Sequence, residues 1–253
     1  MSLARQLLTL AIVSVFVSIL FNVDKVQAKV PVSIELVFAV DTSISVDGFE
    51  YGIMMKGIAD AFRKPEIIDL IEHHEGVAVA LFQWSSEISE YDMIDWHLLK
   101  KPASILNFAD KVEAVERAPR TGFTALGEAI VFAVRMISEN SFEGRHLKVD
   151  VAGDGRNNFG IQVSKAHEKA KQFEIVINGL PILTTTDKEA GNLVNYYREE
   201  VILGPGAFIE TASEYSDFAR AFFRKLKREL SPMVSNEGKV PGILVRNQVP
   251  AGK

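Results

Sequence analysis

The sequence predicts an α/β domain built on a doubly wound, mostly parallel β-sheet with helices on both faces. After residue 28, short runs of apolar and β-branched residues alternate with stretches of helical periodicity. Strands separated by helices are typical of parallel sheets that are covered on both sides. The 253 residues, 47% of them hydrophobic and 24% charged, also suffice for one such domain with a substantial core.

Six segments have the composition of strands. The first is Ser33–Val40, which we expect to be buried on both faces of the sheet. Met93–Leu98 is expected to be an edge strand. The other four predicted strands are Val77–Phe82, Leu147–Ala152, Glu174–Ile177 and Ala207–Glu210.

Helical periodicity fills most of the chain between these strands. The first helix is predicted over Asp47–Phe62, with Phe49, Ile53, Ile58 and Phe62 facing the core. The last helix is predicted to follow Ser213 as its N-cap and to end near Leu230. Further helices are predicted after Pro65 and over Ile105–Val115, Leu126–Ile137, Ile161–Phe173 and Ala190–Arg198.

The two ends of the chain differ from the single domain expected over residues 32–230. Arg5, the uncharged apolar run Leu7–Phe21 and small residues up to Ala28 predict a signal peptide over residues 1–28, cleaved after Ala28. The run is shorter than the roughly 18 apolar residues of a membrane span, so we expect no membrane insertion after cleavage, an uncleaved anchor being the alternative. Residues 231–253 mix Pro, Gly, Ser and charged residues and are predicted to be a flexible tail.

Composition narrows the location and the kind of partner. The absence of cysteine excludes disulfides, thiolate zinc sites and thiol catalysis. Together with an export signal, it favours a bacterial periplasmic or secreted protein over a disulfide-stabilised extracellular domain. The formal net charge of -5 disfavours nucleic acid as a partner, because phosphate binding favours a basic face.

Three segments rich in oxygen ligands are candidates for one metal site. Asp41, Ser43 and Ser45 follow the first predicted strand, Asp154 follows the fourth, and Thr124 lies in the loop before the helix that precedes the fourth. Ligands of doubly wound sheets bind beyond the carboxyl ends of strands, where the strand order reverses. Carboxylate and hydroxyl oxygens suit Mg²⁺, Mn²⁺ or Ca²⁺, of which we expect Mg²⁺. Neutral hydroxyl ligands leave most of the cation's charge uncompensated, so the site is expected to attract a carboxylate presented by a protein partner.

These segments resemble the metal-ion-dependent adhesion site of von Willebrand factor A-type domains. That pattern has Asp-x-Ser-x-Ser after the first strand, a Thr in a Gly-rich loop and an Asp in a turn after the fourth strand. The resemblance implies direct ligation by Ser43, Ser45 and Thr124, with Asp41 and Asp154 acting mainly through water. It also implies a Rossmann-like sheet of six strands, five parallel and one an antiparallel edge, over the whole of the predicted domain.

More narrowly, the chain is similar to a family of exported, functionally uncharacterised bacterial A-domain proteins. The segments that carry this resemblance are Phe82-Gln83-Trp84-Ser85, Gly153-Asp154-Gly155, Ile177-Asn178-Gly179-Leu180-Pro181-Ile182, Tyr196-Tyr197 and Gly204-Pro205-Gly206-Ala207-Phe208. Two positions depart from the common metal-site pattern: Gly153 stands in place of Thr, and Phe123 in place of a Gly. Neither is a predicted ligand, so the departures concern loop shape.

The resulting interpretation is a divalent-cation-dependent protein-binding module that is not an enzyme. Arg156 and Asn157 are expected at the rim of its site, with a plain surface loop as the alternative. Taken singly, each of the three segments also fits a turn or a helix cap, and only their combination indicates a metal.

Two other functions remain open. A haloacid-dehalogenase-like phosphohydrolase would use Asp41 as its nucleophile, but Ser43 stands where such enzymes have a second Asp. The chain also has no Gly-x-Ser-x-Gly elbow and no phosphate-binding Gly-rich loop ending in Lys. The third possibility is an A-domain that has lost its metal and acts as a scaffold.

Overall fold

The computed structural model of the chain describes residues 28–88, 93–118, 122–184 and 190–231, and every structural statement below concerns these residues. The predicted signal segment up to residue 27 and the tail from residue 232 lie outside them. Ala28, the predicted cleavage position, is the first described residue and is exposed. None of the described helices is long and apolar enough to cross a membrane.

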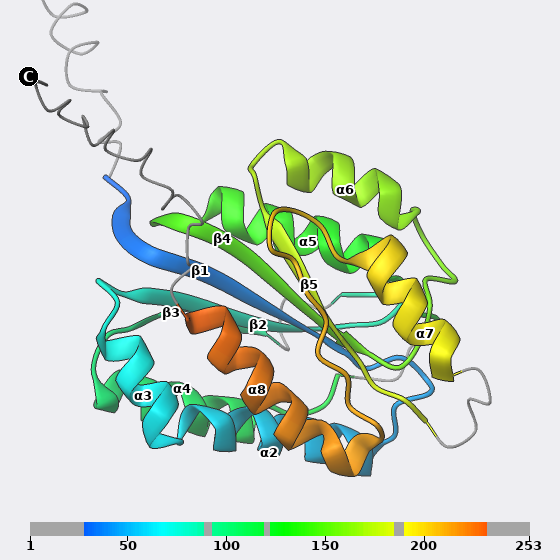
Figure 1. Cartoon of the computed structure of the whole chain (residues 1–253), viewed down its shortest axis with the longest axis horizontal. Coiled ribbons are helices and arrows are strands. Elements are labelled where there is room, and N and C mark those ends of the chain that lie inside the picture. The colour runs from blue at the N-terminus through cyan, green and yellow to red at the C-terminus, as the bar shows by residue number, and fades with distance from the viewer. Residues whose placement is uncertain (1–27, 89–92, 119–121, 185–189, 232–253) are drawn as a thin grey trace, which may run out of the picture.

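A twisted five-stranded sheet forms the centre of the domain, with strand order β3-β2-β1-β4-β5 (Figure 1). Its neighbouring strands are parallel except for β3, which pairs antiparallel with β2 at the edge. The chain therefore builds outward from β1 on one side and then returns to its other side with β4. The strands are β1 (Val30–Asp41), β2 (Val77–Trp84), β3 (Ile94–Leu99), β4 (Phe142–Gly153) and β5 (Val176–Pro181).

Helices cover both faces of this sheet, as the sequence predicts. Alternate residues of β1 serve the two sides: Leu36 and Phe38 face one core, and Val37 and Ala39 face the other. Figure 1 shows α2, α3, α4 and α8 on the first face and α5, α6 and α7 on the second. The helices are α2 (Gly48–Phe62), α3 (Pro65–Glu72), α4 (Pro102–Ala114), α5 (Leu126–Glu139), α6 (Val163–Lys171), α7 (Ala190–Tyr196) and α8 (Phe218–Leu230).

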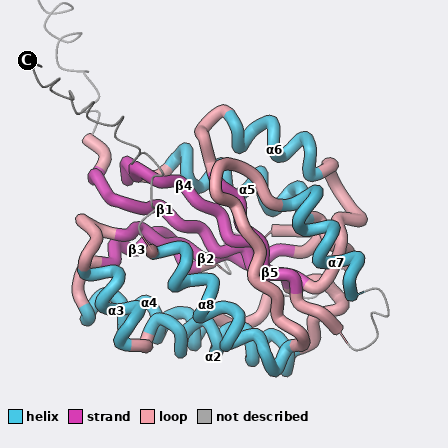
Figure 2. The backbone as a smooth tube through the Cα atoms, viewed as in Figure 1, coloured by secondary structure: helices cyan, strands magenta, loops and turns pink. Residues whose placement is uncertain are grey.

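The expected sixth strand over Ala207–Glu210 is replaced by a loop that lies along β5 (Figure 2). Isolated parallel bridges join Gly179 to Ile209 and Ile182 to Ala212. The ladder is interrupted because the Phe208 N–H donates to the side-chain oxygen of Asn178 at 2.8 Å, in place of a backbone carbonyl. Two glycines just before this segment, with φ of 95° and 74°, also turn the chain. The sheet therefore has five described strands rather than six.

Two helix starts refine the predictions. Asp47 caps α2, and its carboxylate accepts hydrogen bonds from the backbone N–H groups of Phe49 and Glu50. The expectation that Phe49 faces the core is wrong: its side chain is 78% exposed in the first turn. The last helix, α8, begins at Phe218 rather than directly after Ser213, because a 3₁₀ turn at Tyr215–Asp217 precedes it.

Candidate metal centre

The first predicted ligand segment begins with a carboxylate inside the protein. Asp41 is the last residue of β1 and is fully buried. Its Oδ1 accepts a hydrogen bond from the Ser43 backbone N–H at 2.7 Å, which bends the chain into a tight turn. Its Oδ2 has no hydrogen-bond partner among the described residues. A buried carboxylate oxygen without a partner is costly, so this atom suits a water or cation that the protein itself does not supply.

Hydroxyl groups connect this turn to the end of β4. The Ser43 and Ser45 Oγ atoms lie 3.1 Å apart, and the Ser45 hydroxyl donates to Asp154 Oδ1 at 2.7 Å. The contact spans two chain segments because β1 and β4 are parallel neighbours whose carboxyl ends meet at one edge. The structure thus brings Asp41, Ser43, Ser45 and Asp154 together at the point where the strand order reverses, as the sequence predicts.

Thr124 approaches the same turn from the loop before α5. Its backbone N–H donates to the side-chain oxygen of Asn158 at 2.8 Å, and the Asn158 N–H donates back to the Thr124 carbonyl at 2.9 Å. A Cβ on Gly155 would lie 3.2 Å from Thr124 Oγ1, so the hydroxyl of Thr124 rests directly against the residue that follows Asp154. All five predicted ligands therefore lie on three adjoining loops.

The glycine at position 153 has a steric reason in this chain. A Cβ there would lie 2.8 Å from Asp41 Oδ2 and 3.1 Å from the hydroxyl oxygen of Tyr197. The Tyr197 hydroxyl in turn donates to the Gly153 carbonyl at 3.3 Å. A larger residue at position 153 would press on the Asp41 carboxylate, so the departure from the common pattern preserves the room around it.

Electrostatics sets this site apart from an ordinary polar turn. Burial, together with the nearby Asp154 carboxylate, raises the pKa of Asp41 to about 7. Burial also raises the pKa of Asp154, although hydrogen bonds from Ser45 and Tyr215 act in the opposite direction. Two carboxylates that crowd together under burial favour the arrival of a positive charge.

The donor set consists of oxygen atoms alone. The described residues contain no group of three or more His, Asp or Glu side chains that could hold a metal. The candidate set instead combines two carboxylates with three neutral hydroxyls, which is chemistry suited to a hard divalent cation. The residues present therefore fit an ion of that kind.

Two positioning residues escaped the sequence analysis. The Arg117 guanidinium donates to the carbonyls of Thr42 at 2.9 Å and Val46 at 2.8 Å. These hydrogen bonds fix both ends of the loop that carries the two ligand serines. The Tyr215 hydroxyl donates to Asp154 Oδ2 at 3.0 Å. Both residues come from segments distant in sequence, and no local pattern signals their role.

The two predicted rim residues make contacts within the domain. Arg156 donates to the Asn192 carbonyl at 3.0 Å, and its guanidinium lies 5.2 Å from the centre of the Tyr196 ring. The Asn157 side chain accepts from the Gly127 N–H at 2.9 Å and donates to the Ile161 carbonyl at 3.0 Å. These side chains brace the loop after β4, and their role in partner binding stays a prediction.

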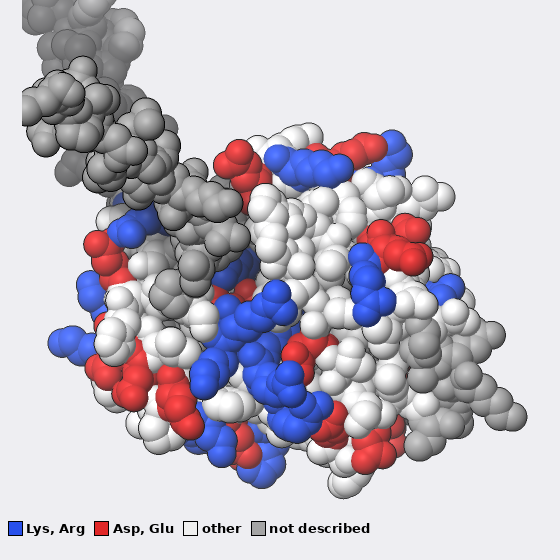
Figure 3. Space-filling model, viewed as in Figure 1, with Lys and Arg blue, Asp and Glu red and all other residues white. Residues whose placement is uncertain are grey.

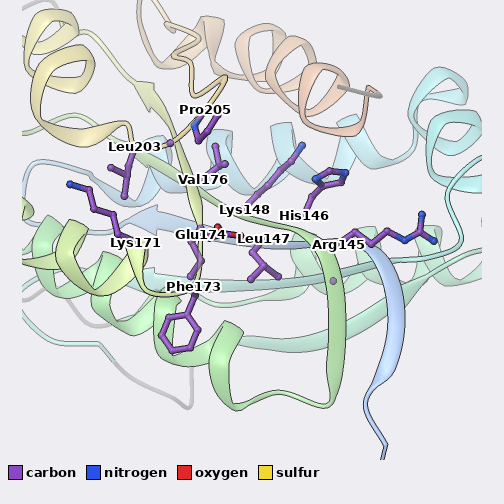
Figure 4. A pocket seen from close by; sticks show the side chains of 13 residues that line it. Arg145, His146, Leu147, Lys148, Lys171, Phe173, Glu174, Val176, Leu203 and Pro205 are labelled. Carbon is purple, nitrogen blue, oxygen red and sulfur yellow. The ribbon is translucent and has the colours of Figure 1, made fainter. Parts of the chain in front are cut away.

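A hollow of about 530 Å³ lies away from the candidate centre. Figure 4 shows Lys148, Val176 and Pro205 around it, between the middle of β4 and the segment after α7. None of the five predicted ligands lines it. Lys148 precedes Asp154 by six residues, which is about 20 Å along an extended strand, so the two features are separate.

A cationic band lies over α8 (Figure 3). Arg220 forms an ion pair with Asp217 at 2.5 Å, Arg224 pairs with Glu210 at 3.0 Å, and the Arg228 guanidinium lies 3.8 Å from the centre of the Phe208 ring. Much of this positive charge is therefore engaged within the domain. We therefore interpret the cationic band as an ordinary solvent-exposed helix face.

Solved structures share this fold. The chain superposes on the pilus adhesin SpaC from Lactobacillus rhamnosus GG, in its open conformation, with a TM-score of 0.57 at 13% identity, over 78% of this chain and 30% of that chain. The vWF domain of the type V pili tip protein Mfa5 from Porphyromonas gingivalis gives 0.54 at 12% identity, over 79% of this chain and 96% of that chain. Proximal thread matrix protein 1 from the mussel byssus, described with a zinc occupied MIDAS motif, gives a TM-score of 0.54 at 16% identity. That superposition covers 78% of this chain and 46% of that chain.

These similarities establish a von Willebrand factor A-type fold and no more, because all the identities are low. The chain spans less than half the length of SpaC and of the mussel protein. A comparison with curated proteins finds no match. A family model described as "Protein of unknown function (DUF1194)" matches residues 31–234, most of the chain, and the chain therefore belongs to that family.

Proposed function

We propose that this chain is an exported, divalent-cation-dependent protein-binding module. Ser43, Ser45 and Thr124 would hold the ion directly, and Asp41 and Asp154 would hold it mainly through water. The main evidence is the series of neighbouring oxygen atoms that leads from Asp41 through the two serine hydroxyls to Asp154. It includes Asp41 Oδ2, which has no hydrogen-bond partner among the described residues. When bound, the ion supplies a coordination position that an oxygen anion of a partner protein can fill.

Each group of the protein has a separate task in this proposal. The carboxylates of Asp41, which is buried, and Asp154, which is half-buried, attract the cation, and their limited contact with solvent weakens the screening of their charge. The hydroxyls contact the ion without neutralising it, so its demand for an external anion persists. We propose Mg²⁺ as the ion, with Mn²⁺ and Ca²⁺ as substitutes, because all three prefer oxygen ligands.

Two further features support this function. The predicted signal peptide would place the domain in the periplasm or outside the cell, where adhesive and assembly proteins act. Among the structures that share the fold, one is described as a pilus adhesin and another as a pili tip protein. These likenesses support a binding role at the level of the fold alone.

We also propose that the domain is not an enzyme. A phosphohydrolase of the alternative type would need Asp41 to reach a substrate phosphorus atom. Asp41 is fully buried, and its Oδ1 is engaged by the Ser43 N–H. With Mg²⁺ present, we expect no turnover of p-nitrophenyl phosphate. Turnover that disappears in Asp41→Asn would contradict this part of the proposal.

Isothermal titration of the purified protein with MgCl₂ and MnCl₂ tests the metal site. We expect one ion to bind per chain in the wild type and binding to be lost in Ser43→Ala. Ser138→Ala is the matched control, because that exposed hydroxyl donates only to a carbonyl of its own helix. Absence of binding in the wild type would refute the proposed function and favour the metal-free scaffold.

A further inference from the structure

Large apolar side chains are exposed on the same loops that carry the candidate ligands. Ile44, 61% exposed, stands between the two ligand serines, and Phe49, 78% exposed, follows in the first turn of α2. Phe123 directly precedes Thr124 and is 54% exposed, and Phe159 directly follows Asn158 and is 46% exposed. Half of the eight exposed large hydrophobic residues in the described part of the chain are thus on these short segments. We call these four residues the apolar rim.

The folded core does not account for the apolar rim. None of its four side chains belongs to either hydrophobic core or to the partly buried residues that pack against the cores. A single exposed apolar residue is normal on a protein surface, but a group around one polar site marks a surface that binds. The apolar rim therefore points to a contact that the isolated domain does not make.

Two members of the rim are held in a fixed arrangement. The rings of Phe123 and Phe159 stack with their centres 5.4 Å apart and their planes 9° from parallel. They belong to the two loops that the reciprocal hydrogen bonds of Thr124 and Asn158 hold together. The contacts that position a candidate ligand therefore also position an aromatic surface beside it, and a rigid aromatic pair loses little side-chain entropy when it binds.

We infer that the partner segment carries an acidic residue flanked by large apolar side chains. This inference rests on the proposed function, which supplies the reason for the carboxylate. The apolar rim supplies the reason for its neighbours: aromatic and aliphatic side chains of the partner would cover Phe123 and Phe159 while the carboxylate reaches the ion. Covering them also removes water from the ion's surroundings, which strengthens its attraction for the carboxylate.

Fluorescence anisotropy with two labelled peptides tests the inference. Both peptides have the same length and a central Glu, which is flanked by Leu and Phe in one and by Ser on both sides in the other. In the presence of Mg²⁺ we expect the wild type to bind the apolar-flanked peptide about tenfold more tightly. Replacing the central Glu by Gln, or adding EDTA, should abolish binding.

The double variant Phe123→Ser, Phe159→Ser should bind both peptides with the same weak affinity. Phe173→Ser is the matched control, because Phe173 is 42% exposed and lies just before β5, at the opposite end of the sheet from the ligands. It should keep the wild-type preference. Equal binding of both peptides by the wild type, no binding of either, or an unchanged preference in the double variant would overturn the inference.

Titration of the same samples with MnCl₂ separates this inference from the proposed function. We expect the double variant to bind the ion as the wild type does, because its substitutions leave every predicted ligand in place. Metal binding without any peptide preference would overturn the inference and leave the metal site standing. Loss of metal binding in the wild type would overturn both.

Discussion

Two pairs of carboxylates in this domain, one fully buried and one buried in part, are compensated in different ways. On the α8 side of the sheet, Lys225 Nζ lies 2.7 Å from Asp150 Oδ2 and 2.9 Å from Glu229 Oε1. At the carboxyl end of the sheet, Asp41 and Asp154 receive hydrogen bonds from hydroxyls and a backbone N–H group. Among the described residues, only the first pair has an ion-pair partner.

The pKa values follow this difference. Burial raises the pKa of Asp150 to about 6, although Lys225 acts to lower it. Burial and the acidic neighbour Asp154 together raise the pKa of Asp41 to about 7. Burial alone would lower the pKa of Lys225, but Asp150 and Glu229 together raise it. Asp150 and Glu229, which Lys225 joins, form a structural element that we call the closed pair. We propose that Asp41 and Asp154, the open pair, receive a cation from outside.

Lys225→Met should have the largest effect on stability. The substitution leaves Asp150 buried without a cation, and Glu229 keeps only Lys148, whose Nζ lies 3.7 Å from Glu229 Oε2. Breaking a buried ion pair from one side costs about 3–5 kcal/mol. Urea denaturation measures the free energy of unfolding. Lys227→Met, an exposed lysine two residues along the same helix, should change it by less than about 0.5 kcal/mol. Similar losses in the two variants would show that the closed pair is unimportant.

The loss in Lys225→Met should be smaller at pH 5 than at pH 8. The pKa of Asp150 is higher in the folded protein, about 6, than its ordinary value of 3.8, so the folded state binds more protons between these values. Stability therefore falls as the pH rises through this window. Because Lys225 lowers the pKa of Asp150, its removal extends the window upward. A loss that does not change with pH would contradict this account.

Metal should stabilise the open pair without affecting the closed one. At a Mg²⁺ concentration a hundred times the Kd, the wild type should be about 2.7 kcal/mol more stable than in EDTA. Lys225→Met should gain the same increment, because Asp150 and Asp154 lie four residues apart, about 13 Å along β4, and distant sites act additively. Urea denaturation with and without Mg²⁺ measures both. A smaller increment in the variant would reveal coupling between the two pairs.

Asp41→Asn should change stability and metal affinity in opposite directions. The amide keeps the Oδ1 acceptor for the Ser43 N–H but removes a buried charge that Asp154 repels. In EDTA the variant should be more stable than the wild type by about 1–2 kcal/mol. Its Mn²⁺ affinity should fall about 10–100-fold, the usual cost of losing a group that supports a metal through a second layer of contacts.

Asp69→Asn is the matched control for this variant, because Asp69 is an exposed carboxylate on α3. It should leave both the stability in EDTA and the Mn²⁺ affinity unchanged. Destabilisation of metal-free Asp41→Asn would mean that the open pair is a structural element like the closed one.

The fold could be predicted from the sequence where it depends on local patterns of apolar and polar residues. The apolar runs that became β1, β2 and β4 are buried along most of their length. The helix predicted over Asp47–Phe62 is found as α2, with Asp47 as its cap. The oxygen ligands could also be placed together, because parallel strands deliver their carboxyl ends to one edge. Their role as metal ligands remains a prediction.

Features that depend on distant contacts escaped prediction. The sixth strand was expected from composition, but the Asn178 side chain takes up the Phe208 N–H where a strand would pair. In the sequence Lys225 is one of several basic residues at the end of the last predicted helix, and only the fold brings it beside Asp150 of β4. Arg117 lies 75 positions from Thr42, whose carbonyl it contacts, so no periodicity relates the two.

Tyr215→Phe should have the smallest effect, and it tests how finely the open pair is adjusted. The Tyr215 hydroxyl donates to Asp154 Oδ2 at 3.0 Å while Ser45 donates to Oδ1, so the carboxylate is held from both sides. Losing one such hydrogen bond costs about 0.5–1.5 kcal/mol, and we expect Mn²⁺ affinity to fall roughly 2–10-fold. Tyr51→Phe loses a hydroxyl that donates to the Val115 and Glu116 carbonyls and should leave the affinity unchanged. If both variants bind Mn²⁺ like the wild type, Asp154 is oriented without Tyr215, and the open pair depends on its own loops alone.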